Sequence, residues 1–387
     1  MEFALNCKEF LEDLSLIQGV VERRHAMPVL SNLYVSAKKD RVMFFATDLE
    51  VGYLSTLGGE VRKDGEALIP SRVLYDAVSL AGEGLARIKK TEKSGVKVSF
   101  EGGTGYKFVG ADVADFPSLP EMEGAQDKIT IDGEALDEMF RLTAYAASRE
   151  MSRYAINGVL LVFEGDSLKT VATDGYRLAI VHREKCVKKV KDKFEVILPH
   201  KGVRELQQLL SHVSSGKDKD KSKKGKKAVS VEFSRKENHL FFTLGSRCIV
   251  MRVLNDSFPN YERVVPKDND KVIRFSREHL IRAVKSASVV LSDAARPVCF
   301  EFSHNSLCVA SENPDSGEAK SELPISYTGE GFKIGFKASH LLDFLSIIGT
   351  DDVLVSLKSE TDQALLEPAD NGGKPLKCLC VIMPMRL

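Results

Sequence analysis

The chain repeats one pattern three times, and this repetition constrains its fold more than any single motif does. Each copy begins with a short alternating strand, passes through one residue suited to cap a helix, and continues into an amphipathic helix. The capping residues are Asn6, Asp132 and Ser276, whose side-chain oxygens can accept hydrogen bonds from the free amides of a first helical turn. The copies begin about 126 and 144 residues apart. Spacing of this length indicates whole α+β domains rather than the units of a solenoid.

A second helix is expected at a matching place in each copy, over residues 69–78, 198–206 and 336–345. Apolar residues three and four apart predict these helices, and proline at the first turn supports the first two. Short alternating runs fill the remainder of each copy. They indicate strands joined by turns that contain Gly or Asp.

Clusters of Pro, Glu, Asp and Asn near residues 125 and 268 predict domain boundaries. We therefore expect three similar domains, over residues 1–125, 126–268 and 269–387. In the second domain a Lys-rich insertion at 216–227 interrupts the pattern. Its composition predicts a solvated loop, and the alternative is an auxiliary contact with phosphate groups.

The charge balance limits the ways in which the chain could bind nucleic acid. It has 55 basic and 55 acidic residues, so its formal charge is zero. A protein that coats DNA by bulk electrostatics should be strongly basic, because phosphate neutralisation supplies most of the non-specific affinity. The balance argues against such a protein but allows the charges to be segregated on two faces.

The remaining composition predicts a cytoplasmic protein without a membrane partner. The first residues have neither the basic nor the apolar segment of a signal peptide, and no run is apolar enough for a membrane helix. The seven scattered cysteines suit reduced thiols better than a disulfide framework.

No group of residues has the spacing of a catalytic or metal site. The eight histidines are dispersed, and the glycines at 102–105 lie between two alternating strands, where they indicate a hairpin turn. Asp48 and Asp174 could form a carboxylate pair, but their equivalent positions in two copies of the repeat favour turn residues. The sequence therefore predicts a binding protein and not an enzyme, with no cofactor and no metal.

Two segments have the composition of a protein-binding surface. Residues 173–178 combine a tight turn with an aromatic residue and an arginine, which are enriched at interface hot spots. The chain ends in an apolar run, 381–387, whose methionines can adapt to varied apolar partners. The alternative for this tail is a final strand docked on its own sheet. Both hold if the strand docks and its last residues line a groove.

Eight motifs, in order along essentially the whole chain, resemble those of the bacterial DNA polymerase III beta subunit family, the sliding clamps. The motifs occupy residues 27–33, 46–50, 115–117, 154–158, 172–179, 258–261, 313–314 and 383–387. The Lys-rich insertion departs from the family pattern but leaves these motifs intact. The resemblance implies an α+β fold of three DNA clamp domains, with helices lining a bore and antiparallel sheets outside. It further implies a head-to-tail homodimer that forms a six-domain ring around double-stranded DNA.

The implied bore has a suitable size. Two helices from each of six domains, packed about 10 Å apart, would leave roughly 28 Å clear, which passes a B-form duplex with a layer of water. A closed ring cannot dissociate sideways, so weak phosphate contacts would suffice. The alternative is a non-ring, sequence-nonspecific DNA-binding protein that uses the Lys-rich loop.

The resemblance also implies a processivity factor that tethers partners through a groove for short linear peptides. The implied partners are the DNA polymerase III alpha subunit, clamp-loader subunits, other polymerases and repair proteins. The groove maps to Ile156, Thr173, Gly175, Tyr176, Arg177, Leu178, Pro259, Arg263, Val264, Val381, Met383, Pro384, Met385 and Arg386. Tyr176 stands where the family often has His, which bears on the preferred peptide.

DNA contacts and a ring interface are expected elsewhere in the chain. Arg24, Tyr154 and Lys201 match positions at which the family contacts DNA. Further candidates lie on or beside the expected helices, namely Arg72, Arg149, Arg153, Arg204, Arg282 and Lys285. At the ring interface, Tyr106 and Phe108 of one copy should meet Val290 and Leu291 of the other.

Overall fold

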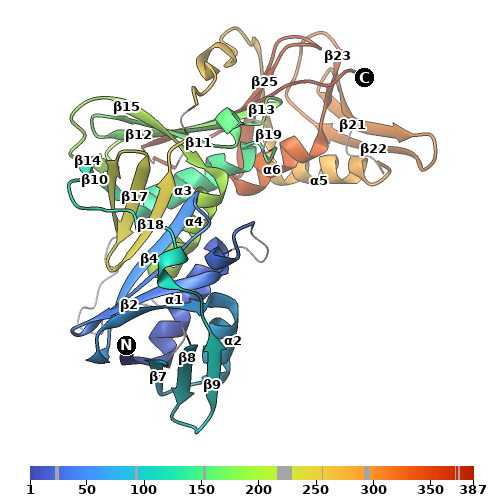
Figure 1. Ribbon diagram of the computed structural model, residues 1–387. Helices are drawn as coiled ribbons and strands as arrows, with labels where there is room; N and C mark the ends of the chain where they lie inside the picture. Colours follow the sequence, from blue (N-terminus) through green and yellow to red (C-terminus); the bar gives the residue numbers. More distant parts are fainter. Residues whose placement is uncertain are drawn as a thin grey trace. The chain divides into compact units, whose positions relative to one another are not determined.

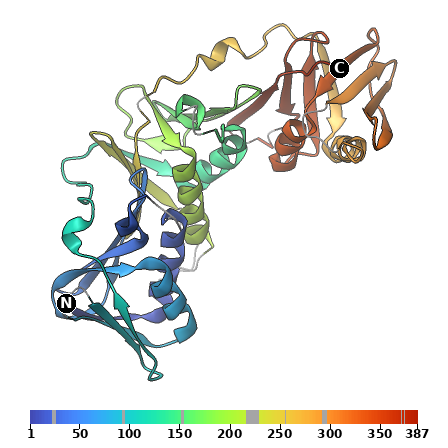
Figure 2. The same ribbon diagram turned by 45° about the vertical axis from the view of Figure 1, so that its right-hand side comes forward.

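The computed structural model describes residues 1–21, 26–91, 95–150, 154–215, 229–254, 256–291, 297–370, 372–373 and 375–387, with only the backbone of Tyr154 (Figures 1 and 2). These residues form two compact units. The first joins Met1–Glu134 with Lys201–Val253, and the second joins Ala135–His200 with Leu254–Leu387.

The first unit is built mainly of antiparallel strands with a few helices. Its described helices are α1 (Cys7–Val20), η1 (Pro28–Ser31), α2 (Ser71–Ala81), η2 (Val113–Asp115) and α4 (His200–Ser214), which enters the unit at Lys201. Its described strands are β1 (Glu2–Asn6), β2 (Asn32–Lys38), β3 (Arg41–Thr47), β4 (Val51–Gly58), β5 (Glu60–Lys63), β6 (Gly65–Pro70), β7 (Leu85–Lys90), β8 (Gly95–Phe100), β9 (Gly105–Val109), β10 (Gln126–Asp132), β16 (Ser230–Lys236), β17 (His239–Leu244) and β18 (Arg247–Arg252).

One sheet of this unit crosses from the first copy of the repeat to the second. Its strands run in the order β10-β16-β17-β18-β4-β3-β2-β6, and a smaller sheet has the order β5-β1-β7-β8-β9. The crossing is the antiparallel pair β4–β18, in which Val51 faces Met251. Helix α1 packs on β3 and β4 and beside α2, and the ring of Phe10 stacks on that of Phe44 with centroids 5.1 Å apart. The sheet and helices therefore share one core.

The second unit is likewise built mainly of antiparallel strands with a few helices. Its described helices are α3 (Gly133–Thr143), which begins in the first unit, η3 (Ala144–Ala146), η4 (Tyr154–Ile156), η5 (Tyr261–Arg263), α5 (Arg277–Ser288) and α6 (Ala338–Ile347). Its described strands are β11 (Gly158–Glu164), β12 (Ser167–Thr173), β13 (Arg177–Arg183), β14 (Val187–Lys188), β15 (Phe194–Pro199), β19 (Lys271–Ser276), β20 (Val298–Ser303), β21 (Ser306–Asn313), β22 (Gly317–Pro324), β23 (Phe332–Phe336), β24 (Asp352–Leu357), β25 (Ala364–Pro368) and β26 (Leu376–Ile382).

The second unit also contains a sheet that crosses between copies of the repeat. Its order is β15-β11-β12-β13-β26-β25-β24-β19, and a separate sheet has the order β22-β21-β20-β23. The crossing pair is β13–β26, in which Leu178 faces Val381. Helices α5 and α6 pack side by side in both views (Figures 1 and 2). The last strand of the chain is thus built into a sheet, as one of the two interpretations of the tail predicted.

All six expected helices are present, and the start of α1 is capped as predicted. Asn6 caps α1, since its Oδ1 accepts from the amides of Lys8 at 3.0 Å and Glu9 at 3.4 Å. Ser276 stands at the N-cap of α5 but makes no side-chain hydrogen bond there. The amide of Arg277 is bonded to the carbonyl of Asp351 at 2.8 Å instead. The capping residues therefore predict where a helix begins better than they predict what satisfies its first turn.

Two smaller expectations, for the glycine turn and for the cysteines, agree with the structure. The glycines between β8 and β9 form a turn in which Gly103 has φ +82°. All seven cysteines are free thiols, and burial raises the pKa of both Cys378 and Cys380 to about 12. Across the described ranges, no cluster of three His, Cys, Asp or Glu side chains could hold a metal ion. None of the helices within those ranges is long and apolar enough to cross a bilayer.

Candidate functional site

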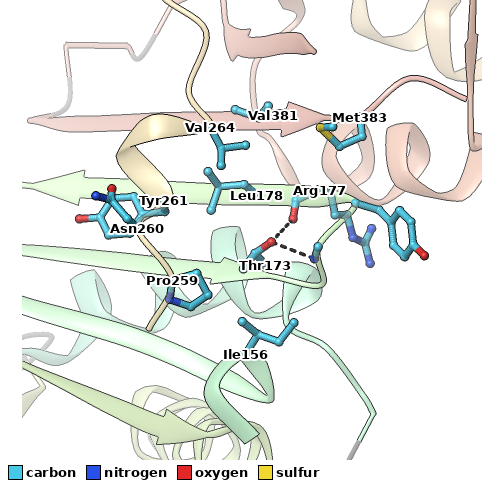
Figure 3. A pocket seen from close by; sticks show the side chains of 12 residues that line it. Ile156, Thr173, Arg177, Leu178, Pro259, Asn260, Tyr261, Val264, Val381 and Met383 are labelled. Atoms are coloured by element: carbon cyan, nitrogen blue, oxygen red, sulfur yellow. Dashed lines mark hydrogen bonds between the residues drawn. The ribbon is translucent and has the colours of Figure 1, made fainter. Parts of the chain in front are cut away.

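The tight turn between β12 and β13 is fixed by its own side chains. The hydroxyl of Thr173 donates to the carbonyl of Arg177 at 2.7 Å and accepts from the amide of Gly175 at 3.0 Å (Figure 3). Asp174 Oδ1 accepts from the amides of Tyr176 at 2.9 Å and Arg177 at 3.0 Å. Gly175 has φ +91°, a left-handed conformation that costs glycine little. Asp174 is therefore a turn residue, as its place in the repeat predicted.

An apolar pocket opens beside this turn (Figure 3). Its volume is about 170 Å³, and a cavity of about 150 Å³ lined by apolar side chains is large enough to bind benzene. Four segments form it: η4, the turn, the stretch around η5, and the end of β26. The lining residues are Ile156, Thr173, Gly175, Tyr176, Arg177, Leu178, Pro259, Asn260, Tyr261, Val264, Val381 and Met383.

The floor of the pocket belongs to a hydrophobic core, while its rim is exposed. Leu178 and Val381 are 3% and 1% exposed and pack in one cluster with Tyr261 at its edge. Tyr176 is 62% exposed and Met383 is 36% exposed. Exposed apolar side chains gathered around a preformed apolar cavity are typical of a docking site for a partner or ligand.

The guanidinium of Arg177 is held by the protein itself. Its Nε lies 3.1 Å from Asp174 Oδ2, its Nη1 lies 2.6 Å from Asp343 Oδ2, and its Nη2 donates to the carbonyl of Tyr145 at 2.7 Å. The side chain is only 10% exposed. Since all three nitrogens have acceptors, Arg177 joins the turn to α6 and to the residues after α3. It gives the pocket a fixed wall.

His340 of α6 lies beside this ion pair. Burial, followed by the positive charge of Arg177, lowers the pKa of His340 to about 4. The ring is therefore neutral at pH 7. Its centroid lies 6.5 Å from that of Tyr176, the aromatic residue at the pocket rim.

Ten of the fourteen residues predicted for the groove line this pocket. The other four are Arg263, Pro384, Met385 and Arg386. Arg263 is exposed in η5. The tail turns away after Met383, because the amide of Met385 donates to the carbonyl of Gly335 at 2.8 Å.

Asn260 and Tyr261 line the pocket but were not predicted to do so. They directly follow Phe258 and Pro259 in one of the motifs that carry the family resemblance. Their place in that motif was the available signal. Of the four residues in that motif, the predicted groove included only Pro259.

The residues proposed for DNA contacts differ in how free their charges are. Arg149 and Lys285 are exposed. Arg72 Nε lies 3.5 Å from Asp76 Oδ2, and Arg282 Nη2 lies 3.3 Å from Glu278 Oε1; both arginines remain mostly exposed. Outside the described residues lie Arg24, Arg153, the side chain of Tyr154 and the insertion at 216–227.

Lys201 and Arg204, on α4, are already paired within the first unit. Lys201 Nζ contacts Asp48 Oδ2 and donates to the carbonyl of Val20 at 3.1 Å. Arg204 Nη2 lies 2.8 Å from Glu205 Oε1, although the Arg204 side chain is still 56% exposed. Burial raises the pKa of Glu205. Of these two cations, Arg204 is the more accessible.

The residues predicted for a ring interface lie at an exposed sheet edge and after a helix. Tyr106 and Phe108 lie on β9, the edge of its sheet, with ring centroids 5.9 Å apart and nearly parallel planes. Val290 and Leu291 follow α5 and are half-buried. An edge strand presents unpaired backbone groups to which another chain can add.

Comparison with known protein families finds matches along nearly the whole chain. Three family models match it, and they describe the N-terminal, central and C-terminal domains of the DNA polymerase III beta subunit. They match residues 1–120, 130–260 and 262–386 respectively.

Relatives match at full length. The beta sliding clamp of Pseudomonas aeruginosa is 31% identical, with 100% of each chain covered. The solved DNA polymerase III subunit beta from the same species superposes with a TM-score of 0.89 at 31% identity, also over 100% of each chain. A sliding clamp from Bartonella birtlesii, solved with bound griselimycin, gives a TM-score of 0.88 at 30% identity and the same coverage.

Proposed function

Because the chain belongs to the DNA polymerase III beta subunit family, the sliding clamps, we propose that the apolar pocket beside the 173–178 turn docks its partner proteins. Members of this family are non-catalytic processivity subunits, so the function lies in binding and not in turnover. The partners we propose are the DNA polymerase III alpha subunit, clamp-loader subunits, other polymerases and repair proteins. Each would present a short linear peptide, and the setting would be the cytoplasm.

One observation carries this proposal: an exposed apolar rim surrounds a preformed apolar cavity. Tyr176 and Met383 are large and exposed at the rim, where they can pack against a peptide side chain. Leu178 and Val381 supply a buried floor against which that side chain can pack. An anchor residue in such a pocket supplies most of the affinity of a short peptide.

We also propose a ring of two chains, each with domains at 1–125, 126–268 and 269–387. The edge strand β9, with its stacked Tyr106 and Phe108, would meet the segment containing Val290 and Leu291 of the second chain. A head-to-tail contact of this kind generates a closed ring when its rotation closes. Double-stranded DNA would pass through the bore and contact Arg72, Arg149, Arg282 and Lys285, whose side chains are exposed.

Peptide binding tests the pocket directly. A fluorescein-labelled peptide from the DNA polymerase III alpha subunit would be titrated with the full chain and followed by fluorescence anisotropy. Deleting Met383 to Leu387 removes a pocket wall and should raise the Kd at least tenfold, as expected for loss of a hot spot. Griselimycin, with which the Bartonella birtlesii clamp was solved, serves as a competitor.

A matched control comes from a groove prediction that the pocket does not include. Arg263→Gln changes an exposed residue of η5 that does not line the cavity, and it should leave the Kd within a factor of two. Both variants should keep the size of the wild-type oligomer in sedimentation. Unchanged peptide affinity after the deletion, at an unchanged thermal midpoint, would contradict the proposed site.

A further inference from the structure

The turn between β3 and β4 repeats the hydrogen bonds of the turn beside the pocket. The hydroxyl of Thr47 donates to the carbonyl of Val51 at 3.0 Å and accepts from the amide of Leu49 at 2.9 Å. Asp48 Oδ1 accepts from the amides of Glu50 at 2.9 Å and Val51 at 2.7 Å. The two turns therefore match bond for bond, with Leu49 in the place of Gly175.

The strand that follows each turn is paired in the same way. In the first unit, the amide of Arg252 donates to the carbonyl of Glu50 at 2.8 Å, at the end of the β4–β18 pair. In the second unit, the amide of Met383 donates to the carbonyl of Tyr176 at 2.9 Å, at the end of the β13–β26 pair. Arg252 thus occupies the position of Met383.

A second pocket opens at this equivalent place and is smaller than the first. Its volume is about 70 Å³, and its lining mixes apolar residues with polar ones. The apolar residues include Phe45, Leu49 and Val250, and the polar ones include Glu50 and Arg252. The ring of Phe45 lines this pocket: a Cβ on Gly52 would lie 2.9 Å from it, and it packs edge-on against Phe116. Room remains for one small apolar side chain and not for a large one.

Leu49 stands at the mouth of this pocket in a strained backbone conformation. It adopts φ +78°, a conformation that is strained for a branched side chain and that Gly175 adopts at little cost. Its side chain is nevertheless 43% exposed at the pocket mouth. Strain of this kind persists where the surrounding structure enforces it, and it concentrates at binding sites.

The charges around the second pocket distinguish it from the first. Arg252 and Glu50 are exposed, and among the described residues neither side chain forms an ion pair. His239 faces Arg252 across the β17–β18 pair. Burial, followed by the charge of Arg252, lowers the pKa of His239. At neutral pH, Arg252 is therefore the cation at this pocket, and it stands where the first pocket has an apolar Met383.

We propose that this second pocket docks a short acidic peptide, seating one small apolar side chain against Phe45, Leu49 and Val250 while an adjacent carboxylate pairs with Arg252. The choice of a peptide as ligand rests on the proposed function of the first pocket. The preference for an acidic residue rests on Arg252 alone. Glu50 lies at the same mouth and repels the peptide carboxylate. Removing the charge of Arg252 should therefore lower the affinity, and removing that of Glu50 should not.

The test uses the full chain with its Leu and Val methyl groups isotopically labelled for NMR. The probe is the capped peptide acetyl-Gly-Glu-Val-Gly-Gly-amide, and the control replaces its Glu with Gln. Binding of the acidic peptide should shift the methyl resonances of Leu49 and Val250 and leave those of Leu178 and Val381 in place. Acetate at the same concentration measures what an anion alone does.

Two variants separate the roles of the charges. Arg252→Gln should weaken binding of the acidic peptide by about two- to fivefold, which is the range for loss of an exposed ion pair. Glu50→Gln should leave its affinity unchanged or strengthen it. Neither variant touches the first pocket, so both should bind the alpha-subunit peptide as the wild type does, which also shows that they fold.

Three results would overturn the proposal: no methyl shift at millimolar peptide, equal shifts from the Gln peptide or from acetate, or full affinity in Arg252→Gln. The deletion of Met383 to Leu387 keeps the two proposals apart. It should abolish binding of the alpha-subunit peptide and leave the Leu49 and Val250 shifts intact. Failure of one pocket therefore does not imply failure of the other.

Discussion

Lys201 of α4 pairs with Asp48, the residue whose other carboxylate oxygen closes the turn between β3 and β4. The Asp48 side chain is only 5% exposed and that of Lys201 is 20% exposed. A lysine held in this way ties its helix to the turn. This contact favours a structural role for Lys201 over the DNA contact that the family resemblance implies.

Lys201→Met should therefore destabilise the fold. It leaves a buried carboxylate without its cation, at a cost of about 3 kcal/mol in the free energy of unfolding. Urea denaturation of the wild type and of Lys201→Met measures this difference in the free energy of unfolding. The control Arg282→Gln removes an exposed ion pair and should change the free energy of unfolding by less than about 0.5 kcal/mol. A stable Lys201→Met protein with weakened retention on DNA would favour the DNA contact instead.

Arg177→Lys should reduce peptide affinity although the charge is kept. Lysine cannot supply the planar set of donors that reaches Asp174, Asp343 and the carbonyl of Tyr145 together. We expect the Kd of the alpha-subunit peptide to rise about tenfold, with a loss of roughly 1–3 kcal/mol in stability from the unsatisfied acceptors. Anisotropy and urea denaturation check the two effects. Wild-type affinity in this variant would mean that the ion pairs do not shape the pocket.

His340 predicts a loss of stability in mild acid. Its pKa is lowered to about 4 in the fold, so the unfolded chain binds the proton more readily below about pH 6.5. Stability is then present at neutral pH and falls as the pH drops from about 6.5 towards 4. Between pH 7 and 5 this group should account for about 2 kcal/mol of the free energy of unfolding.

The measurement compares the wild type with His340→Gln by urea denaturation at both pH values. The wild type should lose about 2 kcal/mol more than the variant over this interval, because Gln cannot titrate. Equal losses would show that folding leaves the pKa of His340 unchanged.

The sequence predicted the repeated elements well because they depend on local patterns. Asn6 identified the start of α1, and the equivalence of Asp48 and Asp174 identified two matching turns. Contacts between distant segments could not be read in the same way. Met385 is drawn to Gly335, some fifty residues away in the sequence, so the end of a motif that suits a groove leaves the pocket.

The same limit applies to charged side chains. No local pattern shows that Asp48 reaches Lys201 on α4, or that Arg177 reaches Asp343 on α6. These pairs form only when separate copies of the repeat come together. The sequence analysis assigned Lys201 to the DNA contacts and Arg177 to the peptide groove. The acceptors that their side chains contact are determined by the folded structure.

The proposed ring interface predicts that a charge on β9 separates the two chains. Phe108→Arg puts a cation into the apolar contact expected with Val290 and Leu291 and breaks its own ring stack with Tyr106. Sedimentation should show the monomer at micromolar concentration, with the alpha-subunit peptide still bound at wild-type affinity. Lys107→Glu, on the opposite face of β9, is the matched control for a charge change. A dimer that survives Phe108→Arg would place the interface elsewhere.

Retention on circular DNA distinguishes a topological hold from an electrostatic one. A ring loaded on a nicked plasmid by the clamp loader should remain bound in salt of about 0.5 M, because it need not rely on phosphate contacts, whereas an electrostatic binder loses affinity steeply as salt rises. Cutting the plasmid once should release the ring from its free ends.

Deleting residues 216–227 should leave both results unchanged if the Lys-rich insertion is only a solvated loop. Gel filtration of the protein–plasmid complex before and after cutting gives the answer. If the protein stays on the plasmid after cutting, or if deleting residues 216–227 abolishes its retention, the result would favour a DNA-binding protein that does not encircle DNA.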